Sequence, residues 1–183
     1  MNVFLINLDR TTNLLGALAL AISDRIETQI KDQFDRSGTS AAALVFLGYI
    51  PGLPVEVLRQ VLHRSHPGTV RLIDRLEKDG LVKRLKTDDG RAVALHITEK
   101  GEEVRSCLLK SRSHTLEGAL ENLTAEERVT FGTLMAKVLS NLPDTEVEKH
   151  HICRLCAVDL CTDCPIPGHA SMLEPYRNDT SHG

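Results

Sequence analysis

The stretch from His66 to Gly101 reads HPGTVRLIDRLEKDGLVKRLKTDDGRAVALHITEKG. Its first part spaces apolar residues as a helix does, and Gly80 stands where a C′ glycine ends a helix. From Leu81 the chain alternates apolar and basic residues, as a β-strand does. Asp89-Gly90 is a sequence typical of a hairpin turn. Thr98 can then cap the helix that follows the hairpin. The helical apolar positions are Val70, Leu72, Ile73 and Leu76. This stretch predicts one helix followed by a β-hairpin and a new helix.

Two shorter helices are expected before this unit. Ser40 can cap an apolar helix that runs to about Gly48, and Pro54 suits the first turn of a helix that runs to about Leu62. Ser65 can cap the helix that follows, whose first turn tolerates Pro67. The order of elements is that of a winged helix-turn-helix, with the third of these helices as the recognition helix.

Long helices flank this unit. They are expected over residues 7–34, 99–122 and 124–142, the last opened by a Thr124-x-x-Glu127 capping box. Helices this long carry more apolar surface than one small wing domain can cover, so we expect a homodimer. The fold class is therefore mainly α with a small β wing, a winged helix-turn-helix with long dimerisation helices. We divide the chain into an N-terminal dimerisation helix (1–36), the winged helix-turn-helix domain (37–100), C-terminal dimerisation helices (101–142) and a cysteine-rich tail (143–183).

Composition narrows the class of protein. The 183 residues are 42% hydrophobic but have no apolar run long enough for a membrane span and no signal peptide, so a cytoplasmic protein is expected. Aromatic residues make up only 3%, which argues against stacking on single-stranded nucleic acid. No nucleophile–base pair or phosphate loop is present, so no enzyme activity is predicted.

Charge is concentrated on the winged unit. The whole chain carries −3, yet the segment between Arg59 and Arg91 holds nine basic and five acidic residues and carries +4. Neutralising DNA phosphates requires a local basic patch rather than a basic chain. Arg71 and Arg75 are four residues apart and share one face of the recognition helix, which suits contacts with guanine or phosphate.

The segments TVRLIDRLEKDGLVKR and DDGRAVALHITEKG resemble the recognition helix, wing and following helix start of MarR-family transcriptional regulators. Similarity extends from about Ala41 to about Gly101. The turn before the recognition helix, Leu-Gly-Leu-Ser in that family, here reads Leu62-His63-Arg64-Ser65. His63 therefore occupies a glycine-like position, and histidine tolerates positive φ better than most residues.

The resemblance implies a dimeric repressor of double-stranded DNA whose recognition helices lie about 34 Å apart, one turn of DNA. It also implies that Arg91 enters the minor groove and that Asp89 holds an arginine in position. Family members often bind small inducers, but no residue here identifies one. The candidate DNA-binding residues are Ser65, His66, Gly68, Thr69, Arg71, Arg75, Arg84, Lys86, Asp89 and Arg91.

Four of the five cysteines lie in the tail as C-x2-C-x4-C-x2-C, at Cys153, Cys156, Cys161 and Cys164. Two C-x-x-C turns can converge on one metal, and both a zinc ion and an iron–sulfur cluster fit, although neither spacing template matches fully. Unliganded thiols and disulfides are the alternatives. His150, His151 and His169 are expected to be neighbours rather than ligands. The remaining cysteine, Cys107, is expected to be buried in packing.

These patterns predict a DNA-binding regulator that senses redox state or metal supply through the four cysteines. One alternative is a winged-helix module that binds protein. The other is a thiol-disulfide protein that uses the C-x-x-C pairs, although no thioredoxin-like βαβ pattern is present.

Overall fold

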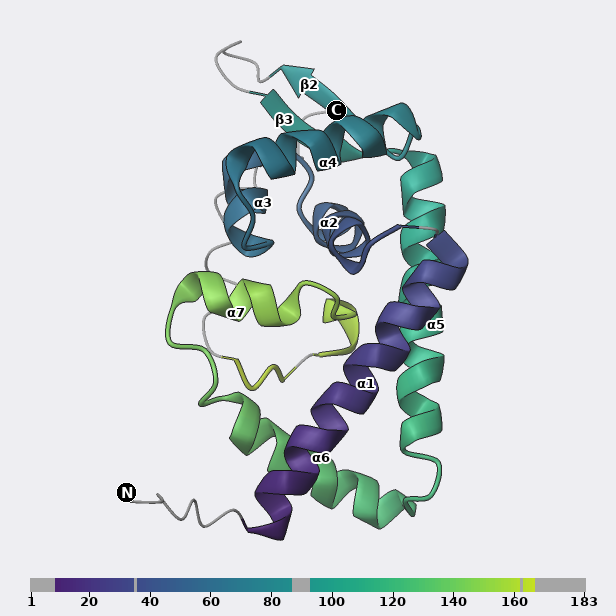
Figure 1. The fold of residues 1–183 in the computed structure, drawn as a ribbon, viewed down its shortest axis with the longest axis vertical. Coiled ribbons are helices and arrows are strands. Elements are labelled where there is room, and N and C mark those ends of the chain that lie inside the picture. The colour runs from purple at the N-terminus through teal and green to yellow at the C-terminus, as the bar shows by residue number, and fades with distance from the viewer. Residues whose placement is uncertain (1–8, 35, 87–92, 162, 167–183) are drawn as a thin grey trace, which may run out of the picture.

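The computed structural model describes residues 9–34, 36–86, 93–161 and 163–166 (Figure 1). The helices and strands in chain order are α1 (Arg10–Phe34), α2 (Gly38–Tyr49), β1 (Leu53–Pro54), α3 (Val55–Val61), α4 (His66–Lys78), β2 (Val82–Lys86), β3 (Val93–Ile97), α5 (Glu99–Ala119), α6 (Ala125–Leu139), α7 (Glu146–Cys153) and the 3-10 helix η1 (Val158–Leu160). The predicted fold class, mainly helical with a small antiparallel wing, is confirmed. None of the described helices is both long and apolar enough to cross a bilayer.

The sheet has the order β1-β3-β2, with both pairs antiparallel. Strand β3 is central: Leu95 is the register partner of Leu53 in β1 and of Arg84 in β2. The sequence did not predict β1, because a strand of two residues has no periodicity to detect. The turn predicted at 87–90 lies outside the described residues.

The core is built around α2. Every residue from Ala41 to Leu47 is buried, and α5 and β3 both pack against this helix. Buried side chains of α4, such as Ile73 and Leu76, join the same core. The recognition helix is therefore held by its apolar face, which leaves its opposite face for solvent.

Helix α1 packs along α5, while α4 and the wing lie at the top of Figure 1 and α6 at the bottom. The capping box at Thr124 and Glu127 is present and starts α6 where expected. In contrast, α2 is capped by Ser37, whose side chain accepts from the backbone N–H of Ser40, and not by Ser40 itself. The prediction placed the cap three residues late because Ser37 and Ser40 both lie near the start of the helix, and serine is a preferred N-cap residue.

Helix α7 was not predicted within the tail. It begins with a second capping box, in which Thr145 and Glu148 satisfy each other's backbone N–H groups. The Thr-x-x-Glu spacing was readable in the sequence. Helix α7 packs against α3, so the start of the tail is docked on the DNA-binding unit.

Candidate nucleic-acid interface

The turn between α3 and α4 depends on one left-handed residue. His63 has φ of 50°, which confirms that it fills the glycine-like position. Its backbone N–H donates to the Gln60 carbonyl, and the Arg64 N–H donates to the Arg59 carbonyl. Histidine accepts this conformation at a modest cost, and the two hydrogen bonds hold the turn in place.

The recognition helix α4 begins at a conventional N-cap. The Ser65 side chain accepts from the Gly68 N–H at 3.3 Å, which confirms the predicted cap. Gly68 is buried, and Thr69 is fully buried with its hydroxyl donating to the Ser65 carbonyl at 3.1 Å. Both residues therefore face inward and stabilise the first turn, and their contact with DNA stays a prediction. Ser65 and His66 are exposed at the same helix end.

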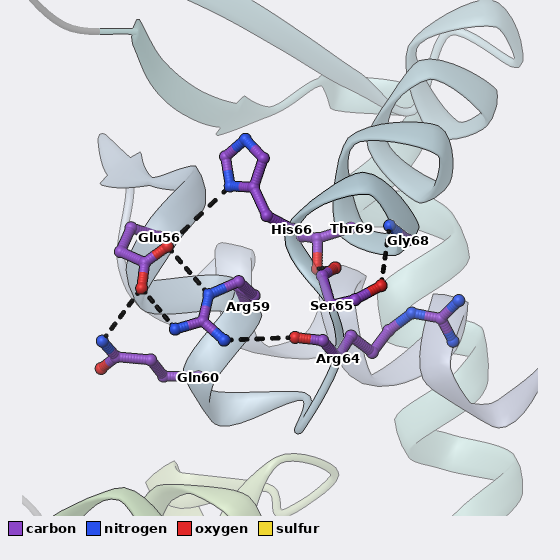
Figure 2. Close-up of polar contacts among 8 residues, drawn as sticks. All are labelled: Glu56, Arg59, Gln60, Arg64, Ser65, His66, Gly68 and Thr69. Atoms are coloured by element: carbon purple, nitrogen blue, oxygen red, sulfur yellow. Dashed lines mark hydrogen bonds and ion pairs between the residues drawn. The ribbon is translucent and has the colours of Figure 1, made fainter.

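Figure 2 shows an acidic residue beside this helix end that the sequence analysis did not single out. The Glu56 carboxylate accepts from the Arg59 guanidinium, and the Nδ1 atom of His66 lies 3.9 Å from it. The hydrogen bond from Arg59 lowers the pKa of Glu56 to about 2. Glu56 is therefore ionised at neutral pH. Another nitrogen of the Arg59 guanidinium donates to the Arg64 carbonyl at 3.3 Å, and this hydrogen bond connects α3 to the turn.

The outward face of α4 carries Arg71 and Arg75, and both are exposed. The helix ends in a Schellman motif: the Gly80 N–H donates to the Glu77 carbonyl and the Leu81 N–H donates to the Leu76 carbonyl. Gly80 has φ of 73°, which confirms its predicted role as the C′ residue. Both ends of the recognition helix are thus fixed by local hydrogen bonds.

Strand β2 of the wing presents two of the candidate basic residues differently. Lys86 is exposed, whereas Arg84 is partly buried and forms ion pairs with Asp74 and Glu77 of α4. Arg84 therefore connects the wing to the recognition helix. If Arg84 also contacts DNA, its guanidinium must bind a phosphate or base while it remains paired with Asp74 and Glu77. The wing-tip residues Asp89 and Arg91 lie outside the described residues.

The first C-x-x-C pair begins at the end of α7. The Cys153 thiol is buried and forms a hydrogen bond with Cys156. This bond, with help from the cations Arg112 and Arg154, lowers the pKa of Cys156 to about 6. The same bond and burial raise the pKa of Cys153. The hydrogen bond therefore favours the thiolate at Cys156 and the thiol at Cys153.

The second pair, Cys161 and Cys164, also forms a hydrogen bond. Burial, followed by the charge of Cys164, raises the pKa of Cys161, and Cys156 adds to that effect. The two pairs are therefore close enough to interact. Within the described part of the chain, no group of three or more His, Cys, Asp or Glu side chains is arranged so that it could hold a metal ion. His169 lies outside the described residues.

Cys107 is exposed on α5. The expectation that it packs in the core was wrong, because the amphipathic pattern of α5 did not show which part of the helix other elements cover.

Comparisons of sequence and of structure both find similarity to proteins of the MarR family. Residues 34–92 match the MarR family. An uncharacterised HTH-type transcriptional regulator of Bacillus subtilis (strain 168), YybA, is 28% identical over 129 residues, which cover 70% of this chain and 85% of the relative. A MarR family protein from Bacillus stearothermophilus is 25% identical with a TM-score of 0.65, over 71% of this chain and 91% of that structure.

The fold is also shared with MepR, described as a transcription regulator of the Staphylococcus aureus multidrug efflux pump MepA. That structure is 20% identical with a TM-score of 0.65, over 74% of this chain and all of the other. YybA and MepR are both described as transcription regulators and not as enzymes, in agreement with the prediction of no enzyme activity. Residues 34–92 therefore match the MarR family, and the chain shares its fold with solved proteins of that family.

Proposed function

We propose that this chain is a homodimeric repressor that binds a pseudo-palindromic site on double-stranded DNA through α4 and the wing. One observation carries this proposal: Arg71 and Arg75 are exposed on the outer face of α4, while the apolar residues of its inner face are buried in the core. A fixed helix with two arginines on one face can enter the major groove without reorganising. Lys86 and Arg91 would extend the contact along the wing, with Asp89 positioning an arginine.

The dimer is supported by apolar side chains that the single chain leaves exposed. Helix α6 has no buried residue, and its exposed apolar residues include Val129, Leu134, Met135 and Val138. The start of α1 exposes Leu14, Leu15, Leu18 and Leu20. Long helices with exposed apolar faces favour self-association, and the two-fold symmetry would place two recognition helices about 34 Å apart.

Replacing Arg71 tests the DNA contact. Arg71→Ala is expected to weaken duplex binding by about tenfold and to make its dependence on salt less steep, because one cation fewer displaces counterions from the phosphates. The measurement is fluorescence anisotropy with a labelled duplex from beside the protein's own gene, over a series of salt concentrations.

Arg25→Ala is the matched control, since Arg25 is an exposed arginine on α1, outside the helix-turn-helix. Equal losses in the two variants would contradict a specific role for Arg71. A wild-type protein that shows no salt-sensitive binding to any duplex would contradict the proposed function as a whole.

The proposal includes a metal centre at the four cysteines, either a zinc ion or an iron–sulfur cluster. Two observations support it: each C-x-x-C pair is internally hydrogen-bonded, and the pairs interact with each other. The lowered pKa of Cys156 supplies one thiolate, the form that binds a soft metal. Through this centre the protein would respond to metal supply or redox state.

Metal analysis of protein purified without oxygen tests the centre. A stoichiometric metal is expected, with brown colour and sulfide for a cluster or colourless protein with zinc. Changing all four tail cysteines to serine should remove it, whereas Cys107→Ser should not. Metal-free wild-type protein would contradict the centre. Unchanged DNA affinity of the four-serine variant under both reducing and oxidising conditions would contradict sensing.

A further inference from the structure

Helix α7 docks on the turn that precedes the recognition helix. The His151 ring stacks on the His63 ring, with the ring centroids 3.8 Å apart and the planes at 2°. Nδ1 of His151 also lies 2.8 Å from the Val61 carbonyl at the end of α3, in hydrogen-bonding position. One side chain of the tail therefore contacts both the last turn of α3 and the left-handed residue of the α3–α4 turn.

The tail is also anchored on α2 and the core. His150 is fully buried, and its ring meets the Phe46 ring of α2 edge-on, with the centroids 6.1 Å apart. Leu155 packs against the main core. Further along the chain, the Val158 N–H donates to the Tyr49 hydroxyl at 3.2 Å. None of these contacts involves a cysteine side chain, so the position of α7 follows from ordinary packing and hydrogen bonds.

The docked tail leaves the outer face of the recognition helix uncovered. Figure 1 shows α7 below α3, with α4 and the wing above it. Arg71 and Arg75 are exposed with the tail in place. The docked arrangement is therefore compatible with DNA binding, and its effect on α4 passes through the turn.

The stack bears on the backbone conformation of that turn. A φ of 50° is less favourable for a residue with a Cβ than for glycine, the residue that the family pattern has at position 63. The direction of the Cα–Cβ bond changes with φ, so a His63 ring held on His151 favours the left-handed backbone that put it there. An aromatic pair favours its stacked arrangement by roughly two- to tenfold.

We infer that His151 is a positioning residue for DNA recognition: its ring offsets the cost of histidine at a glycine position and so keeps α4 in the orientation that presents Arg71 and Arg75. The inference rests on the proposed function and makes the tail a working part of the DNA-binding unit. Whenever the turn leaves the left-handed conformation, affinity for DNA falls with the fraction of protein that remains competent to bind.

The test measures duplex binding of the whole chain by anisotropy. A chelator and a reductant are present throughout, so that the cysteines are in the same state in every variant. His151→Ala is expected to bind about fivefold more weakly than wild type, within the range for one ring pair. Its salt dependence should be unchanged, because no phosphate contact is lost. His114→Ala, at an exposed histidine on α5, is the matched control and should bind as wild type does.

A glycine background separates positioning from a general loss of docking. In His63→Gly the turn takes a positive φ without strain, so adding His151→Ala should weaken binding by less than about twofold. If docking of α7 mattered only through the hydrogen bond to Val61, the loss would be equal in both backgrounds.

Two further variants divide the contacts of His151. His151→Phe keeps the ring but loses the hydrogen bond to Val61, and it should keep most of the wild-type affinity. His151→Asn loses the ring but keeps a side-chain donor, and it should bind as weakly as His151→Ala. Circular dichroism and titration of the active fraction restrict every comparison to folded protein. If His151→Ala does not fold, His151→Phe against His151→Asn decides the question.

The outcomes are distinguishable. Wild-type affinity in His151→Ala, a changed salt dependence, an equal loss in both backgrounds, or a larger loss in His151→Phe than in His151→Asn would overturn the inference and leave the proposed function standing. Absence of salt-sensitive duplex binding by the wild-type chain would overturn the proposed function and the inference with it.

Discussion

Gly101→Ala is expected to destabilise the fold by about 3 kcal/mol, the upper range for overpacking a closed site. A Cβ at Gly101 would lie 2.1 Å from the Leu81 carbonyl oxygen and 2.7 Å from Cγ1 of Ile97. The first of these is a backbone atom, so it cannot move aside as a flexible side chain would. The first turn of α5 must approach this closely, because the Thr98 hydroxyl donates to the Gly80 carbonyl at 2.7 Å.

Urea unfolding followed by circular dichroism measures this effect. Gly118→Ala is the matched control: it lies in the same helix, and an added Cβ there would meet no other atom within 4 Å. Its expected effect is neutral to stabilising by up to about 1 kcal/mol, since alanine favours the helix over glycine. Equal stability of the two variants would show that the approach of α5 to Leu81 does not constrain the fold.

Leu134→Glu is expected to convert the proposed dimer largely to monomer. Leu134 is 54% exposed in the single chain although it is apolar, and Val138, one helical turn later, is 48% exposed. In a two-fold interface each substitution occurs twice, so one change brings two carboxylates into an apolar contact. Like charges at an interface cost several kcal/mol, and the dimer dissociation constant should rise at least about a hundredfold.

Light scattering coupled to size exclusion measures the oligomeric state over a range of concentrations. Thr133→Glu adds the same charge one residue earlier, about 100° around the helix, and should affect the dimer less. A Leu134→Glu protein that remains dimeric at micromolar concentration would place the interface elsewhere. DNA affinity should fall with dimer content, because a monomer contacts only one half-site.

Local patterns predicted the helix-turn-helix well. Ser65 and Thr98 accept from the backbone N–H groups that the N-cap rule specifies, and Gly80 has the positive φ that its position requires. His63 likewise takes the left-handed conformation that the family pattern assigns to glycine. Each of these features depends on residues within about four positions, so the sequence contains the whole interaction.

The sequence did not show which of the candidate DNA-binding residues face solvent. Thr69 and Gly68 occupy the start of the recognition helix, yet both turn toward the core. Arg84 belongs to the basic run, but Asp74 and Glu77 of α4 bind its guanidinium because the wing folds back on that helix. Which side of a helix or strand faces solvent depends on what packs against it, and no local rule contains that information.

The sequence alone determined the order of the helix-turn-helix, the wing strands β2 and β3 and the long helices, the caps at Ser65, Thr98 and Thr124, and the left-handed turn, because these depend on neighbours along the chain. Only the tertiary structure decided where the tail lies. His63 and His151 are 88 residues apart, and their stacking follows from the packing of α7 against α3. Contacts between residues so far apart depend on how the core places the helices, so no sequence pattern near either histidine could indicate them.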